Sequence, residues 1–345
     1  MIAVLILAAG LWGLGNLLRA SLMLRVAMVV TLWIGVVTLH LALPDGTALR
    51  EMTGGDARIW LVLGGFALLG GGYFTGLRWL KSRVARTKIV VAGGTFRAAE
   101  LDRYARHIML REIGGPGQGK LKAAKVLVIG AGGLGSPALL YLAAAGVGTI
   151  GVIDDDQVEG SNLQRQIIHT DQRIGMAKVQ SAVIAMTALN PFIEVRPYRR
   201  RLTEDIAADL IADFDLVLDG SDNFDTRYLV NRVCVTLGKP LISGAITQWE
   251  GQLSLFDPAH GSPCYECVFP VRPAPGLVPT CAEAGVAAPL PGVIGAMMAM
   301  EAVKHITFAG EPLRGRLMIH DALYGETRVI GVKRRADCAV CSVSH

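Results

Sequence analysis

The sequence predicts an α/β protein with a Rossmann-like, doubly wound sheet and an antiparallel continuation, preceded by an all-α transmembrane anchor. Strand-like apolar runs alternate with helical patterns from residue 100 onward, which is typical of a mainly parallel sheet. A glycine-rich turn follows the first of these strands, and the first 80 residues hold three long apolar runs. We therefore expect an anchor over 1–80, a basic connector over 81–99 and an α/β domain over 100–345.

The three apolar runs cover residues 2–18, 26–43 and 59–77, and none contains Lys, Arg, Asp or Glu. At about 1.5 Å per residue, each run approaches the ~30 Å hydrocarbon core of a bilayer. A signal peptide is the alternative for the first run, but no Lys or Arg precedes it and no clear small-x-small cleavage site follows. A buried hairpin in a soluble domain is the alternative for the first two. We expect three spanning helices.

Positive charge flanks these runs. The first 90 residues carry nine Lys or Arg and three Asp or Glu, so the net positive charge of the chain comes from residues that flank the predicted membrane spans. This charge therefore gives no support to nucleic-acid binding. Cations lie between the first two runs and again over 78–88, which places these segments on the cytoplasmic side. We expect a multi-pass protein with its N-terminus outside, its connector resting on anionic headgroups and its α/β domain in the cytoplasm.

The glycine-rich turn follows the apolar strand 126–129. Gly130, Gly132 and Gly135 fall in the order G-x-G-x-x-G, which turns a strand into a helix and directs unpaired backbone N–H groups at an anion. The next strand, 149–153, ends in Asp154, where a Rossmann unit places its ribose-binding carboxylate. These features alone fit both a dinucleotide enzyme and an ATP user.

The segment after Asp154 favours ATP. Ser161-Asn-Leu-Gln-Arg-Gln166 supplies Arg165, and Gly175-Met-Ala-Lys178 supplies Lys178. A triphosphate needs several such cations, whereas a dinucleotide does not. With these motifs the chain resembles, from about residue 101 to 341, the ThiF/MoeB/HesA family of E1-like adenylating enzymes that activate ubiquitin-like proteins. The match is closest to its bacterial molybdopterin-synthase adenylyltransferase type.

The resemblance implies a nucleotide site. Asp154 would bind the ribose, Arg165 and Lys178 the phosphates, and Asp222 a Mg²⁺ ion. The residues implied to bind the nucleotide are Gly130, Gly132, Gly133, Gly135, Asp154, Ser161, Asn162, Leu163, Gln164, Arg165, Lys178, Asp222 and Asn223. Asp222 and Asn223 follow a predicted strand at 214–219, and helix capping by Ser221 or Asp222 is the alternative.

Four further residues draw their expected roles from the same family. Arg106, on a helix predicted over 101–108, would reach the ATP phosphates of the partner subunit in a homodimer, although His107 stands where the family has Gln. Arg227 and Asn231 are expected to orient the turn that carries Asp222. Cys281, in a Pro- and Gly-rich loop, matches the crossover-loop Cys that is covalently acylated in some members.

The implied reaction transfers AMP from ATP to the C-terminal glycine carboxylate of a ubiquitin-fold sulfur-carrier protein and releases pyrophosphate. The carrier expected first is the small subunit of molybdopterin synthase, in molybdenum cofactor biosynthesis. The thiamine-pathway carrier is one alternative, and a membrane-tethered nucleotide-binding module without adenylation is another. No rhodanese-like segment follows Cys341, so we expect a separate sulfurtransferase. In a bacterium the membrane would be the inner membrane.

Four of the six cysteines form two C-x-x-C pairs, Cys264 with Cys267 and Cys338 with Cys341. Such paired knuckles suit a tetrahedral zinc site, and redox dithiols are the alternative. The resemblance implies a structural zinc ion that pins the C-terminal tail to the core. Cys234 lies in a helical apolar pattern and is expected in the core.

The remaining pattern predicts further elements of the alternating sheet. We expect helices near 139–146, over 178–190 closed by Pro191, and over 203–212 capped by Thr203. Further strands are predicted at 193–195, 240–246 and 251–256, the last two as the antiparallel continuation.

Overall fold

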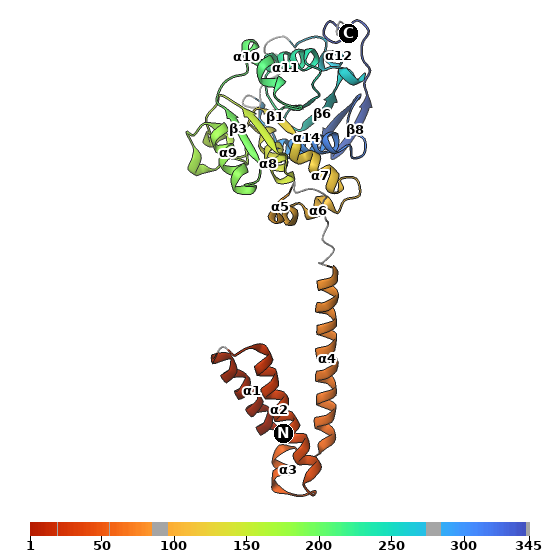
Figure 1. The fold of residues 1–345 in the computed structure, drawn as a ribbon. Coiled ribbons are helices and arrows are strands. Elements are labelled where there is room, and N and C mark those ends of the chain that lie inside the picture. Colours follow the sequence, from red (N-terminus) through yellow and green to blue (C-terminus); the bar gives the residue numbers. More distant parts are fainter. Residues whose placement is uncertain (19, 55, 85–95, 274–283, 343–345) are drawn as a thin grey trace. The chain divides into compact units, whose positions relative to one another are not determined.

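The chain folds into two compact units, Met1–Val90 and Val91–His345 (Figure 1). The computed structural model describes residues 1–18, 20–54, 56–84, 96–273 and 284–342. The first unit is entirely helical in its described residues, and the second is an α/β fold. Most of the predicted connector lies outside the described residues. Cys281, in a separate segment, also lies outside them.

The N-terminal unit consists of four helices: α1 (Ile2–Leu17), α2 (Leu22–Ala42), α3 (Ala48–Thr53) and α4 (Ala57–Val84). Helix α2 packs against α1 and α4. The Trp33 indole N–H of α2 donates to the Trp60 carbonyl of α4 at 2.8 Å. A Cβ atom on Gly64 would lie 2.3 Å from the Trp33 ring, so only glycine permits this approach. Gly64 therefore serves helix packing, as small residues do in membrane bundles.

Two segments of this unit, Leu22–Ala42 and Ala48–Leu77, are long and apolar enough to cross a membrane by length and composition. Only 6% of each apolar window is buried, which is unlike the core helix of a soluble domain. Helix α1 has 16 residues, or about 24 Å, and falls short of the ~30 Å core. Two of the three predicted spans thus have the required length, and membrane insertion stays a prediction.

An eight-stranded sheet forms the centre of the second unit, in the order β3-β2-β1-β4-β5-β6-β7-β8. Strands β3 through β5 of this order pair in parallel, and β5 through β8 pair antiparallel. This arrangement confirms the predicted Rossmann-like sheet with an antiparallel continuation. The strands are β1 (Lys125–Ile129), β2 (Thr149–Ile153), β3 (Glu194–Tyr198), β4 (Leu216–Asp219), β5 (Leu241–Ile246), β6 (Glu250–Phe256), β7 (Arg316–Asp321) and β8 (Glu326–Gly331).

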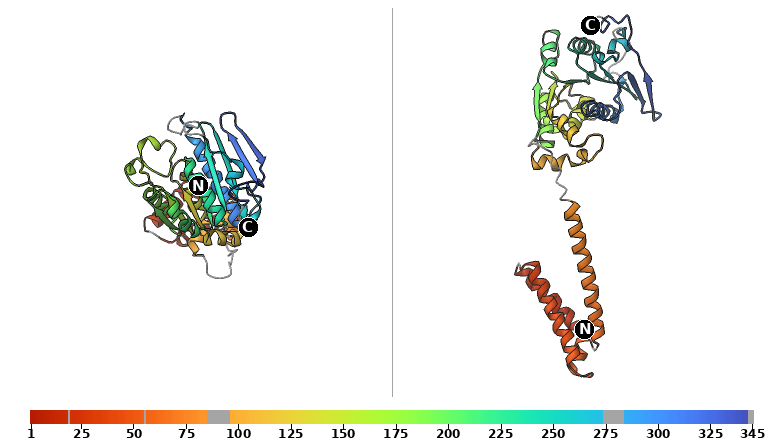
Figure 2. Two further views of the ribbon diagram at one scale, coloured as in Figure 1. Left: turned by 90° about the horizontal axis from the view of Figure 1, so that it is seen from above. Right: turned by 45° about the vertical axis from the view of Figure 1, so that its right-hand side comes forward.

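Helices cover both faces of the parallel part of the sheet (Figure 2). In β1, Val126 and Val128 face one apolar cluster, which α7, α8, α9 and α14 complete, and Leu127 and Ile129 face another, which α10, α11 and α12 complete. A strand buried on both faces reads as a continuous apolar run, which explains the sequence pattern. The helices are α5 (Ala98–Arg103), α6 (Ala105–Ile108), α7 (Gly114–Ala123), α8 (Gly135–Ala145), α9 (Lys178–Leu189), α10 (Glu204–Ala212), α11 (Phe224–Thr236), α12 (Tyr265–Val268) and α14 (Pro289–Thr307).

The prediction of one continuous helix over 101–108 is wrong, because the structure has two helices there, α5 and α6, which are separated at Tyr104. The Tyr104 hydroxyl accepts a hydrogen bond from the Asn190 amide at 2.7 Å. Its ring also lies where a Cβ atom on Gly146 would stand, with the nearest ring atom at 2.5 Å. The break therefore accompanies the burial of Tyr104 against the C-terminal ends of α8 and α9.

We expect residues 96–345 to fold without the N-terminal unit, because, among the described residues, the apolar clusters of the second unit are formed by Ile113 and residues that follow it. The truncated chain should remain in the supernatant and unfold cooperatively, whereas the full-length chain should sediment with membranes and need detergent for extraction. Sedimentation after a high-salt wash measures this. Release of the full-length chain by salt alone would contradict the anchor, and aggregation of the truncated chain would contradict the independence of its fold.

Candidate nucleotide site and cysteine cluster

The predicted nucleotide residues gather at the carboxyl ends of β1, β2 and β4. Strand β1 pairs with β2 on one side and with β4 on the other, so the turns after these strands meet at one edge. A Cβ atom on Gly130 would lie 3.3 Å from the Gly220 carbonyl oxygen, which shows the turns after β1 and β4 in contact. Successive connections leave this edge in opposite directions, and such a switch point is where open α/β sheets bind ligands.

The glycine turn, residues 130–135, joins β1 to α8. Gly130 has a φ of 90°, which favours glycine, and a Cβ atom on Gly135 would lie 1.9 Å from the Gly130 oxygen. Gly132 and Gly133 are half-buried, and within the described residues their N–H groups donate to no other protein group. Together with the start of α8, these free donors form a site for an anion.

Asp154 at the end of β2 is bonded to the glycine turn. Its carboxylate accepts hydrogen bonds from the backbone N–H of Ala131 and of Asp156, both at 2.8 Å. Burial raises the pKa of Asp154, although the charge of Lys178 and the two N–H donors oppose the rise. The carboxylate is thus fixed beside the turn, as a ribose-binding group needs to be.

Lys178 opens helix α9 and is 5% exposed. Its Nζ lies 2.6 Å from a carboxylate oxygen of Asp156, whose side chain is 64% exposed. A buried ammonium group needs a counter-charge, and here an exposed carboxylate supplies it. A phosphate bound at the glycine turn could take over that role.

Arg165 lies beside Gly133 of the glycine turn. Its Cγ atom would be 3.7 Å from a Cβ on Gly133, and its guanidinium donates to the Asn162 side-chain oxygen at 3.0 Å. Asn162 in turn donates to Glu159 at 3.3 Å. Neighbouring Leu163 is half-buried, and Ser161 and Gln164 are exposed. The structure therefore brings Arg165 and Asn162 to the glycine turn as one bonded pair.

Buried hydrogen bonds stabilise the turn after β4. Buried Asp219 accepts hydrogen bonds from Ser221 Oγ at 2.6 Å and from Ser243 Oγ at 3.1 Å. Arg227 of α11 donates to the Ser221 carbonyl and to Ser243 Oγ, and lies 3.5 Å from Asp219. The predicted orienting role of Arg227 is confirmed. Asp222 is exposed at the head of this turn.

Two expectations for this turn need correction. The first concerns the helix cap: Asn223 caps α11, because its side-chain oxygen accepts from the Thr226 N–H at 2.9 Å, while its contact with a nucleotide stays a prediction. Capping thus falls to Asn223 and not to Ser221 or Asp222. Asn231 does not orient the turn, since it accepts from the Tyr265 N–H at 2.9 Å and holds α12 instead.

Sequence reasoning missed two residues that lie against the glycine turn. Gln166 is buried, its Nε2 would be 3.7 Å from a Cβ on Gly132, and its Oε1 has no partner in the described part of the chain. His169 is also buried, and its Nε2 lies 2.9 Å from the Ala131 carbonyl oxygen. Their positions in the sequence could have indicated them: Gln166 and His169 are polar residues one and four positions after Arg165, and the two residues between them are apolar.

Arg106 is exposed on α6. Its predicted contact would be with a partner subunit, so it stays a prediction, as does the covalent role of Cys281. A groove of about 560 Å³ between the first turns of α10 and α11 is lined by Arg232 and Arg272, among others. Each of these arginines pairs with a carboxylate, Arg232 with Glu204 and Arg272 with Asp225.

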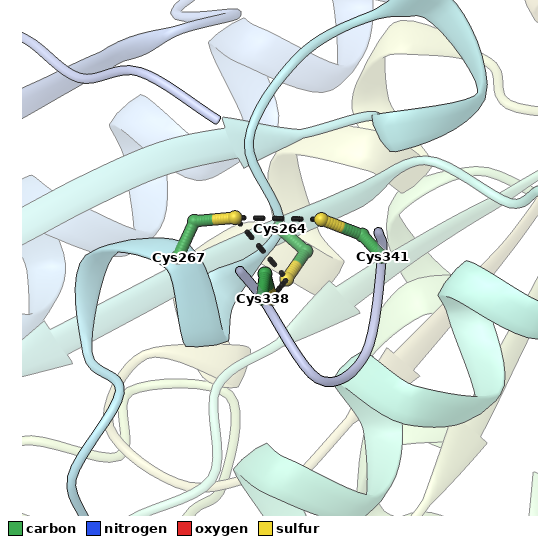
Figure 3. Close-up of side chains that lie close together, drawn as sticks. All are labelled: Cys264, Cys267, Cys338 and Cys341. Atoms are coloured by element: carbon green, nitrogen blue, oxygen red, sulfur yellow. Dashed lines mark hydrogen bonds between the residues drawn. The ribbon is translucent and has the colours of Figure 1, made fainter. Parts of the chain in front are cut away.

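Four cysteines converge behind α11 (Figure 3). The Sγ atom of Cys264 lies 3.8 Å from that of Cys267 and 3.6 Å from that of Cys338, and the Sγ atoms of Cys267 and Cys341 are 3.4 Å apart. A tetrahedral ion with Zn–S bonds of about 2.3 Å would separate its ligands by about 3.8 Å. These separations exceed the ~2.05 Å of a disulfide bond, so the sulfur atoms are not bonded in pairs, and all four lie close enough together to hold one metal ion.

The surroundings of the cysteine cluster also suit a metal site. Burial opposes ionisation at Cys338, but hydrogen bonds from the backbone N–H groups of Cys341 and Val340 outweigh it and lower its pKa to about 7. The Arg335 N–H donates to Cys267 Sγ at 3.4 Å. Such N–H···S bonds stabilise thiolates, the form that binds a metal.

Cys234, the fifth described cysteine, is 2% exposed in the core of the sheet, as predicted. Burial raises the pKa of its thiol. It is therefore an inert apolar residue and offers a matched control for the cluster.

Comparison with known proteins identifies similar chains. The sequence profile of the ThiF family matches residues 104–340. A sulfur carrier protein adenylyltransferase of Thermus thermophilus is 50% identical over 246 residues, 70% of this chain and 91% of that protein. A SAMP-activating enzyme E1 of Haloferax volcanii is 47% identical, over 71% of this chain and 90% of that protein. The crystal structure of E. coli MccB with AMPCPP and MccA is 25% identical, with a TM-score of 0.62 over 70% of this chain and 74% of that one.

Replacing Cys338 by Ser should release zinc from the purified protein and lower its unfolding temperature by roughly 10 °C, because a structural metal contributes several kcal/mol to folding. Cys234→Ser should keep the metal. Metal analysis by plasma mass spectrometry, together with thermal unfolding, measures both effects. Wild-type protein that carries no zinc after chelator-free purification would contradict the assignment.

Proposed function

The chain belongs to the ThiF family, and we propose that it transfers AMP from ATP to the C-terminal carboxylate of a ubiquitin-fold sulfur-carrier protein. The observation that carries this proposal is the assembly of free N–H donors, Asp154, Arg165 and Lys178 around one glycine turn. The homologues named adenylyltransferase support the same reaction class.

The donors around the glycine turn match the parts of ATP. Asp154 accepts hydrogen bonds only, once ionised, and so suits the ribose hydroxyls. The N–H groups of Gly132 and Gly133 suit phosphate oxygens. Lys178 lies close enough to Asp154 to affect its charge, Arg165 lies beside Gly133, and together they supply two positive charges toward a triphosphate.

For this reaction the protein mainly has to position the two reactants and neutralise the negative charge of the phosphates. A C-terminal carboxylate is already ionised at neutral pH, so its attack on the α-phosphorus needs no general base. Pyrophosphate leaves with negative charge, which Arg165 and Lys178 stabilise where they stand. In forming that contact Lys178 would exchange Asp156 for phosphate, and the exposed Asp156 carboxylate would return to water.

Asp222 fits a magnesium role by its chemistry and place. It is an exposed carboxylate on the turn that contacts the glycine turn. A hard cation bridging phosphates prefers such an oxygen ligand, and when bound it would supply charge neutralisation. Asp219, by contrast, is fully engaged in the network beneath the turn and is unsuited to a metal.

The more specific parts of the proposal concern the binding partners of the protein and its location in the cell. We propose that the carrier is of the molybdopterin-synthase type, that Arg106 of each subunit completes the partner's site in a homodimer, and that a separate sulfurtransferase supplies sulfur. We also propose that Cys281 can be acylated by the activated carrier. The apolar helices α2 and α4 support a location at the bacterial inner membrane, with the catalytic unit in the cytoplasm.

Exchange of radiolabelled pyrophosphate into ATP tests this function. We expect exchange by the purified protein to depend on a sulfur-carrier protein with an intact C-terminal glycine, and to be faster with the molybdopterin carrier than with the thiamine carrier. A carrier that lacks its last glycine is the matched control. Nucleotide binding without any carrier-dependent exchange would point to a module that no longer adenylates, and preference for the thiamine carrier would correct the substrate.

Replacing Lys178 or Arg165 by Ala should lower the exchange rate by roughly a hundredfold or more, because each removes a positive charge from the leaving pyrophosphate. Arg232→Ala is a control of the same kind, since Arg232 is exposed and pairs with Glu204 at 3.2 Å. Its exchange rate should stay within about twofold of wild type. Near-normal exchange by Lys178→Ala would remove the phosphate assignment.

A further inference from the structure

His169 lies against the glycine turn, at the carbonyl group of Ala131. It is 5% exposed, and both of its ring nitrogens have partners: Nε2 lies 2.9 Å from the Ala131 carbonyl oxygen and Nδ1 lies 2.9 Å from Ser181 Oγ. A buried histidine with two directed bonds is held in one orientation.

The hydrogen-bond partners fix the state of the ring. A carbonyl oxygen only accepts, so Nε2 carries the hydrogen that bonds to Ala131. Burial lowers the pKa of His169, and the positive charges of Lys178 and Arg173 lower it further against the bond to Ala131. The ring is therefore neutral near pH 7, and Nδ1 accepts from the Ser181 hydroxyl.

Ser181 is itself fixed. It is fully buried on α9, one turn after Lys178, and Arg173 donates to its backbone carbonyl at 3.1 Å. One helix thus carries both the cation that faces the phosphates and the hydroxyl that supports His169. A shift of α9 would move both groups together.

The peptide between Ala131 and Gly132 is planar and trans, so its C=O and N–H point in opposite directions. We infer that His169 is a positioning residue for the nucleotide site: its Nε2–H holds the Ala131 carbonyl on the buried side and thereby turns the Gly132 N–H toward the bound phosphate. The preceding peptide is fixed in the same way, because the Ala131 N–H donates to Asp154. The two peptide groups on either side of Ala131 are therefore oriented by side chains.

This inference rests on the proposed function, since it takes ATP to bind at the glycine turn. His169→Phe removes the donor and keeps a ring of similar size. We expect it to weaken binding of a non-hydrolysable ATP analogue at least tenfold, on the scale of one lost buried hydrogen bond. His169→Gln can still present an Nε2–H to Ala131 and should bind within about threefold of wild type. His305→Phe, on α14, is the control and should leave binding unchanged.

Calorimetry with the analogue on the full-length chain, together with zinc content and unfolding temperature, decides the matter. Weak binding by folded His169→Phe and its recovery in His169→Gln would support the inference. Normal binding by folded His169→Phe, or equal loss in both variants, would overturn it. If His169→Phe does not fold, Ser181→Ala decides instead, with a several-fold loss expected and unchanged binding contradicting the role. Wild-type protein that binds no analogue would overturn the proposed function and this inference with it.

Discussion

The approach of Gly135 to the carbonyl oxygen of Gly130 sets the geometry on which the nucleotide site depends. With 1.9 Å between that oxygen and the place of a Cβ atom, the chain can pass from β1 to α8 only through glycine. The tight passage leaves the N–H groups of the turn without helical partners and brings the turn after β4 into contact through Gly220. Asp154, at the end of the neighbouring strand, can then reach the turn with a single hydrogen bond.

Buried polar groups hold each turn of this edge in place. His169 and Ser181 support the turn after β1, and Asp219, Arg227 and Ser243 support the turn after β4. Burying such groups costs free energy that only complete hydrogen bonding offsets, so removing one partner leaves the other unpaired. These bonds would preorganise the proposed nucleotide site, because its donors would already be oriented before a ligand binds, which lowers the reorganisation needed in the reaction.

Much of this arrangement could be predicted from sequence, because it follows from short motifs. The glycine spacing, Asp154, and the apolar runs of the parallel strands each carry a local signal. Helix α7 has no such signal, since four glycines in its ten residues hide the helical pattern. The partners of Asn231 and His169 could not be predicted, because each bonds to a segment 34 or 38 residues away in the chain. Tertiary packing, and not local propensity, decides such contacts.

The cysteine cluster joins two points that are 74 residues apart along the chain. A metal held by all four thiolates would close a loop that contains α14, β7 and β8, and closing a loop of that length removes conformational freedom from the unfolded chain. A covalent link of the same span contributes about 4 kcal/mol by this effect. This entropic effect operates where the thiolates keep the ion as the rest of the chain unfolds, whereas an ion that is released on unfolding stabilises the folded state through its binding free energy. The antiparallel end of the sheet, which is far in sequence from the glycine turn, would in that case be stabilised by the lower conformational entropy of the unfolded chain.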